Sequence, residues 1–230
     1  MSDDRPILKR SANTERALRM PRPRLRGRSH LVAALSAPLL VITWVASTPT
    51  GIPRVAIAVF GTGMAVMLTI SAVLHLRRWS PTAYERLFRL DHSGIHVAIG
   101  STGAALALLG LVGWPARLLF TVAVIGSLAG IIVEWLPFAA PRGVNSAIYL
   151  TIGWTPVVVL PWLWSHSGVL VTGLLIAGGV LYTLGAVVVG LRRPDPSPRW
   201  FGYHEIFHLL VLAAIGVHAA MFEVLVRRVG

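Results

Sequence analysis

The feature that most constrains this chain is a series of apolar stretches, each about as long as one membrane crossing. The hydrocarbon core of a bilayer is spanned by about 20 residues of α-helix. Such stretches lie at 31–48, 54–75, 92–112, 115–135, 145–163, 168–190 and 204–225. Prolines, glycines and serines separate them, as turns require. The sequence therefore predicts an all-α, polytopic bundle of seven transmembrane helices.

Composition supports a membrane protein. Hydrophobic residues make up 55% of the 230 residues and charged residues only 13%, too few to cover a soluble domain with polar surface. The chain contains no cysteine, so disulfides are excluded and a metal site would need nitrogen and oxygen ligands.

The basic residues predict an orientation. Cytoplasmic segments of membrane proteins carry an excess of Lys and Arg. With the N-terminus inside, the cytoplasmic segments would hold 17 of the 21 Lys and Arg residues, and the outer segments would hold 4. We therefore expect a multi-pass protein of the cell membrane with a cytoplasmic N-terminus and the C-terminus outside.

The first residues form a separate region. Nine of the 21 basic residues lie in residues 1–28, a stretch without an apolar run. We predict a disordered basic cytoplasmic tail at 1–29 and one transmembrane domain at 30–230. The tail either attracts anionic lipid head groups or only fixes the topology. The expected partners are the bilayer and a lipid substrate, with no nucleic acid.

Five polar side chains are predicted to meet near the cytoplasmic face. Polar groups inside membrane spans are costly, so their positions carry information. The second span ends on the inside, while the third and seventh spans begin there. This topology brings to one depth Ser71, His75, Asp91, His204 and His208.

These residues fit a metal site. His204 and His208 are four apart and share a helix face, and His75 can add a third imidazole. Three nitrogens around one tetrahedral zinc should lie roughly 3.3–4.5 Å apart, with a fourth position open to water. Asp91 would bind that water as a base, and Ser71 would orient a ligand. Singly, Asp91 could be a helix N-cap, and His75 could complement a helix dipole.

The stretch "YHEIFH" at 203–208 also reads as H-E-x-x-H, the pattern of a zinc protease helix. Because His75 supplies a third ligand, we interpret Glu205 as outside the metal site. Three further residues have open roles. His30 lacks a predicted partner, Glu134 is either a pocket carboxylate or pairs with Arg142, and His218 is expected to hydrogen-bond between helices.

Three blocks, "SAVLH", "LDHSGI" and "YHEIFHLLVLAAIGVH", resemble the signature blocks of the hemolysin III family, which is related to progestin and adipoQ receptors and to alkaline ceramidases. The resemblance implies seven helices and a zinc held by His75, His204 and His208 near the cytoplasmic face. It also implies that Asp91 holds the metal-bound water with Ser71 close by, and that lipid amides of the ceramide type are cleaved. The sequence departs from the family at "RSHLVAALSAP".

The sequence leaves three functions to compare. The first is a zinc-dependent hydrolase that cleaves an amide or ester bond in a lipid. The second is a pore-forming or haemolytic protein, which the lack of a continuous polar stripe disfavours. The third is a receptor-like sensor of the membrane with a structural zinc.

Overall fold

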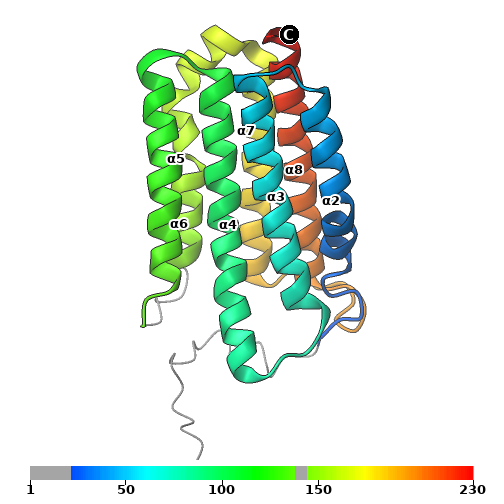
Figure 1. The fold of residues 1–230 in the computed structure, drawn as a ribbon. Helices are drawn as coiled ribbons and strands as arrows, with labels where there is room; N and C mark the ends of the chain where they lie inside the picture. Colours follow the sequence, from blue (N-terminus) through cyan, green and yellow to red (C-terminus); the bar gives the residue numbers. More distant parts are fainter. Residues whose placement is uncertain (1–21, 138–143, 230) are drawn as a thin grey trace, which may run out of the picture.

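The computed structural model describes residues 22–137 and 144–229, and all regular elements in these ranges are helices. The helices stand side by side in one upright bundle (Figure 1). In chain order they are α2 (Arg28–Ser47), α3 (Ile52–Leu76), α4 (Pro81–Gly110), α5 (Gly113–Glu134), α6 (Val144–Gly153), the 3₁₀ helix η1 (Thr155–Val159), α7 (Leu160–Leu191) and α8 (Tyr203–Val229). The predicted all-α bundle is confirmed.

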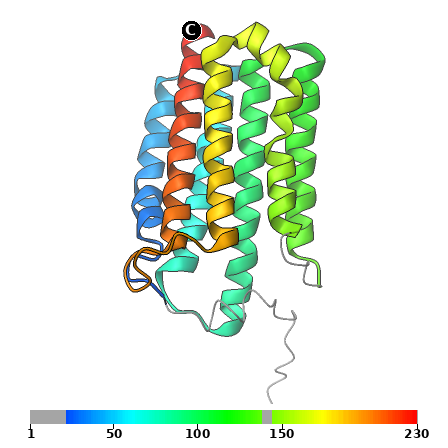
Figure 2. The ribbon, with the colours of Figure 1, turned by 180° about the vertical axis from the view of Figure 1, so that it is seen from behind.

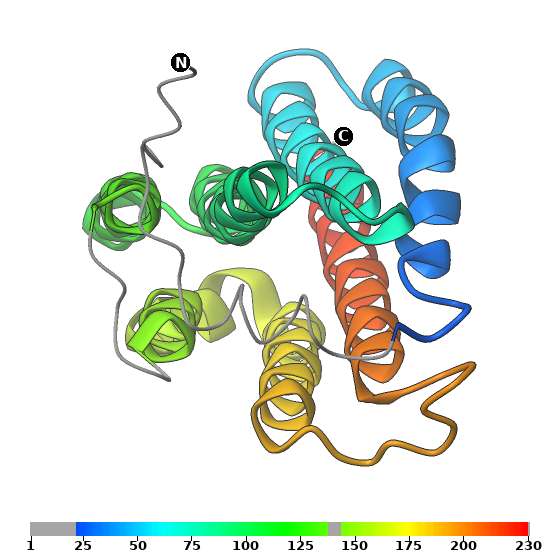
Figure 3. The same cartoon turned by 90° about the horizontal axis from the view of Figure 1, so that it is seen from below.

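The helices enclose a common interior. Seen along their axes, α4 lies between α3 and α5, and α8 packs between α7 and the pair α2 and α3 (Figure 3). Near the C-terminal end of α8 the interior is filled by apolar side chains, including Phe60 and Phe222, whose ring centroids are 4.6 Å apart. The buried polar side chains His30, Ser71 and His208 lie toward the opposite end of the bundle.

Six helical runs in the described residues are long and apolar enough to cross a membrane. They are α2, α3, α4, α5, the run Val144–Leu191 and α8. Large apolar side chains point outward from these helices; Leu35 on α2 is 74% exposed and Ile125 on α5 is 61% exposed. Polar groups inside and apolar groups outside are the arrangement expected of a chain surrounded by lipid. The protein is therefore a polytopic membrane protein.

The fifth run, Val144–Leu191, has 48 residues and is not one straight helix. The 3₁₀ helix η1 interrupts it beside Pro156, and a second break lies at Gly168, whose φ of 78° and ψ of 175° are not helical. The chain passes along α6, turns over at the end of the bundle and returns along α7 (Figure 2). The predicted spans 145–163 and 168–190 both fall within this run.

Helix α4 begins eleven residues before the predicted span 92–112, at Pro81. Ser80 caps this start, since its hydroxyl accepts from the Ala83 amide at 3.4 Å, and Pro81 has the fixed φ that suits the first helical position. Asp91 therefore lies in the third turn of α4. The alternative that Asp91 caps this helix is therefore wrong.

The predicted tail at 1–29 lies outside the described residues up to position 21. Its last part, which we call the N-terminal strap (residues 22–27), contacts the loop before α8. The Arg24 amide donates to the Arg199 carbonyl at 3.0 Å, and the Leu25 amide donates to the Trp200 carbonyl at 3.1 Å. The strap thus joins the start of α2 to the start of α8.

Candidate metal centre

Three histidines from two helices form a cluster inside the bundle. His75 lies in the last turn of α3, and His204 and His208 lie in the first two turns of α8. One nitrogen of each lies within 4.8 Å of the others, and the Nε2 atoms of His75 and His204 are 3.2 Å apart. The spacing is close to the predicted range of roughly 3.3–4.5 Å for ligands of one zinc.

The three histidines converge at a largely buried position. His75 and His208 are buried, and His204 is half-buried. The three ring centroids form a nearly even triangle, with separations of 4.6, 4.6 and 5.0 Å. His208 Nδ1 is buried without a hydrogen-bond partner among the described residues. Three imidazoles that converge on one point could hold a metal ion such as zinc.

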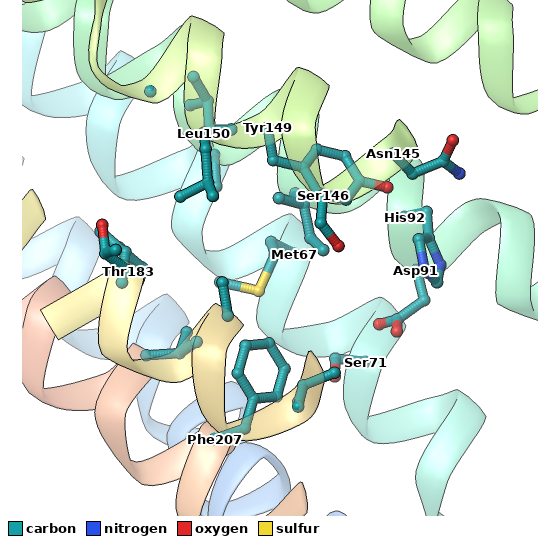
Figure 4. A pocket seen from close by; sticks show the side chains of 18 of the residues that line it. Met67, Ser71, Asp91, His92, Asn145, Ser146, Tyr149, Leu150, Thr183 and Phe207 are labelled. Atoms are coloured by element: carbon teal, nitrogen blue, oxygen red, sulfur yellow. The ribbon is translucent and has the colours of Figure 1, made fainter. Parts of the chain in front are cut away.

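Asp91 and Ser71 lie beside the cluster without joining it. Asp91 Oδ2 is 3.8 Å from His75 Nε2, too far for a direct hydrogen bond. Ser71 is one helical turn before His75 and is buried. Figure 4 shows the Asp91 carboxylate and the Ser71 side chain facing the same cavity from α4 and α3. The carboxylate is therefore placed to contact a molecule bound at the histidines.

His30 contributes to the site in a way that the sequence did not reveal. Its ring stacks on His208 with a centroid separation of 3.8 Å and an interplanar angle of 6°. Its Nδ1 shares a hydrogen bond with Ser71 Oγ at 2.9 Å, and the side chain is 2% exposed. His30 thus fixes the orientation of one cluster residue and of the neighbouring serine. Its place directly before the first apolar stretch was the signal that the sequence offered.

We predict that His30→Ala weakens zinc binding while leaving the fold intact. Residues that orient metal ligands typically change metal affinity by about 10–100-fold, and His30 orients the His208 ring. Competition with a chelator would measure the zinc dissociation constant. The matched control is His96→Ala, because His96 is also a buried histidine but is not one of the cluster residues. Equal zinc affinity in wild type and His30→Ala would contradict the assignment.

Glu205 lies outside the histidine cluster and is engaged at the start of α8. Its Oε1 is 2.6 Å from Arg26 Nε, and its Oε2 accepts from the Gly202 amide at 2.7 Å. The carboxylate therefore anchors the N-terminal strap and the first turn of the helix. This geometry does not support the protease reading of H-E-x-x-H, in which the glutamate activates water at the metal.

The other open residues have partners at a distance from the cluster. Glu134 accepts hydrogen bonds from Asn145 Nδ2 at 2.8 Å and from the Tyr149 hydroxyl at 2.7 Å. Its alternative partner, Arg142, lies outside the described residues. His218 Nε2 is 3.4 Å from the Leu175 carbonyl on α7, so the predicted contact between helices is confirmed.

A large cavity extends from the cluster into the bundle. It has a volume of about 1150 Å³ and is lined by His75, His204, Asp91 and Ser71 at one end. Farther in, its lining is mostly apolar and includes Met67, Leu106, Leu119, Leu160, Leu175 and Val211. Such a space could hold a molecule with a polar group at the histidines and a long apolar chain beyond them.

Comparison with known proteins agrees with this architecture. The family profile described as "Haemolysin-III related" matches residues 18–219. The chain is 30% identical over 196 residues to Hemolysin-3 of Bacillus cereus, an overlap of 83% of each chain. It is 32% identical over 192 residues to the Heptahelical transmembrane protein ADIPOR2 of Oryza sativa subsp. japonica, covering 76% of this chain and 83% of that one. It is 27% identical over 185 residues to the Adiponectin receptor protein of Drosophila melanogaster, covering 72% of this chain and 41% of that one.

Proposed function

The chain belongs to the haemolysin-III family, and on that premise we propose that it is a zinc-dependent hydrolase of membrane lipids. The observation that carries the proposal is the position of the buried His75, His204 and His208 cluster at one end of the 1150 Å³ cavity. A metal site and an apolar cavity together suit a lipid whose acyl bond lies at the metal.

The proposed topology has seven crossings. The run Val144–Leu191 has 48 residues, enough for two crossings of about 20 residues each, and it is broken at Gly168. Counting it twice brings the six candidate runs to seven. The excess of basic residues at the site's end of the bundle supports a topology with the N-terminus and the site on the cytoplasmic side of the cell membrane.

The residues in and around the cluster have separate roles in the proposed hydrolysis. His75, His204 and His208 would hold the zinc, which when bound polarises a carbonyl and lowers the pKa of water to about 7. Asp91 takes a proton from the attacking water and returns it to the leaving amine or alcohol. Ser71, held by its hydrogen bond to His30, orients the substrate carbonyl. The acyl bond is thereby hydrolysed: the fatty acid gains the hydroxyl group of the water, and the leaving amine or alcohol gains its proton.

Lipid hydrolysis by purified protein would test the proposal. In nanodiscs, protein with measured zinc content is expected to release fatty acid from a ceramide or another acyl lipid. A chelator should abolish the release, and added zinc should restore it, because the site depends on the metal. If zinc-loaded protein releases no fatty acid from any lipid class, a sensor with a structural zinc becomes the better proposal.

Dye-filled liposomes serve as the control for a lytic function, which the name of the Bacillus cereus relative raises. The inner part of the cavity has a mostly apolar lining, which disfavours a water-filled path across the bundle. We expect no leakage, and leakage that persists without metal would favour a pore instead.

A further inference from the structure

The end of the cavity next to the histidine cluster is strongly basic. The cavity lining includes one carboxylate, Asp91, and five arginines. The arginines come from the N-terminal strap, from the end of α3 and from the end of α7: Arg22, Arg26, Arg77, Arg78 and Arg192. Three separate segments thus direct positive charge at one space.

Most of this charge is not neutralised within the described residues. Arg26 pairs with Glu205, and Arg77 lies 4.2 Å from the ring centroid of Trp79. The side chains of Arg22, Arg78 and Arg192 make no hydrogen bond or ion pair with the described part of the chain. Burial, followed by the nearby charges of Arg26 and Arg78, lowers the pKa of Arg22. A cation held under these conditions is stabilised when an anion binds beside it.

The basic region is in contact with the histidine cluster. Gly27, which ends the strap, packs so closely on His75 that a Cβ atom there would lie 2.7 Å from the His75 Cβ. Gly27 also has a φ of 75°, which favours glycine. The strap, which carries Arg22 and Arg26, therefore packs directly on one residue of the histidine cluster.

We propose that these arginines recognise a phosphate-bearing headgroup of an acyl lipid. Guanidinium groups bind phosphate through paired, charge-assisted hydrogen bonds. With the phosphate at the arginines, the neighbouring acyl bond lies at the histidines and the chain enters the apolar part of the cavity. The inference rests on the proposed function and adds the substrate class. It differs from attraction of the tail to the membrane surface, because these arginines line the cavity itself.

A matched pair of lipids would test the assignment. Monoacylglycerol phosphate and monoacylglycerol can carry the same acyl chain and differ only in the phosphate. With zinc-loaded full-length protein in uncharged detergent, we expect the phosphate lipid to bind about tenfold more tightly, as charge-assisted hydrogen bonds allow. Binding and fatty acid release should be measured separately on the same preparation.

The variant Arg22→Gln/Arg78→Gln should lose most of this preference, and it should fold because neither arginine has a partner in the described structure. The matched control is Arg86→Gln. Arg86 is exposed near the start of α4, but it does not line the cavity. This control should keep the preference. Equal loss in the control and the double variant would show a general surface effect and overturn the assignment.

Two further results separate this inference from the hydrolase proposal. A preference in binding without any hydrolysis would support the headgroup site and oppose the hydrolase. Hydrolysis of both lipids with equal affinity would support the hydrolase and overturn the headgroup site. Inorganic phosphate is the third probe; if it binds as tightly as the phosphate lipid, the arginines form a site for a free anion and the lipid assignment is wrong.

Discussion

A His208→Ala protein is expected to purify with almost no zinc, whereas the wild type should hold close to one zinc per chain. His208 is the most deeply buried of the three cluster histidines, and its ring lies 4.6 Å from His204 and 5.0 Å from His75. Its loss leaves two imidazoles, fewer than the three protein ligands typical of a catalytic zinc. Elemental analysis after removal of loosely bound metal would measure the change.

The control for this result is His218→Ala. His218 is on the same helix, ten residues farther on and about 15 Å away, so it cannot bind the same ion. The control should keep the wild-type zinc content. Equal losses in the two variants would place the ion deeper in the bundle than the cluster.

Asp91→Asn is expected to keep its zinc and lose hydrolytic activity by about 10²–10⁴-fold, the usual contribution of a general base. The Asp91 carboxylate oxygen lies 3.8 Å from His75 Nε2. It is therefore near the proposed metal, but Asp91 is not one of the three proposed ligands. An amide of the same shape can still accept a hydrogen bond, but it cannot take up the proton. Zinc content and fatty acid release on one preparation would show both effects.

Glu223→Gln provides a control for Asp91→Asn. Glu223 also accepts hydrogen bonds, from Trp44 and Arg227, but it lies near the other end of α8. We expect unchanged zinc and unchanged release. Loss of zinc in Asp91→Asn would instead make Asp91 a direct metal ligand.

The sequence predicted the helices and the histidine cluster because both follow from apolar length and topology. His75 ends one apolar stretch and His204 begins another, so alternate crossings bring them to the same end whatever the side-chain packing. The break near Gly168 also followed from the local sequence, since Ser165 and Ser167 interrupt the apolar run. These features depend on the order of segments along the chain.

Two features could not be read in the same way, for different reasons. The stacking of His30 on His208 depends on how α2 packs against α8, which apolar periodicity does not specify. The early start of α4 had a local signal, the pair Ser80 and Pro81, but the polar residues that follow resembled a loop. A helix that extends beyond the membrane need not be apolar there.

The N-terminal strap has a consequence for biosynthesis. Leu25 is synthesised well before its partner Trp200, which belongs to the loop before α8. Likewise, His75 can contact His204 only after a further 129 residues have been synthesised. The ligand set and the wall around it are therefore completed only when α8 enters the membrane. A chain released before that point lacks two of the three cluster histidines, so it would lack the proposed metal site.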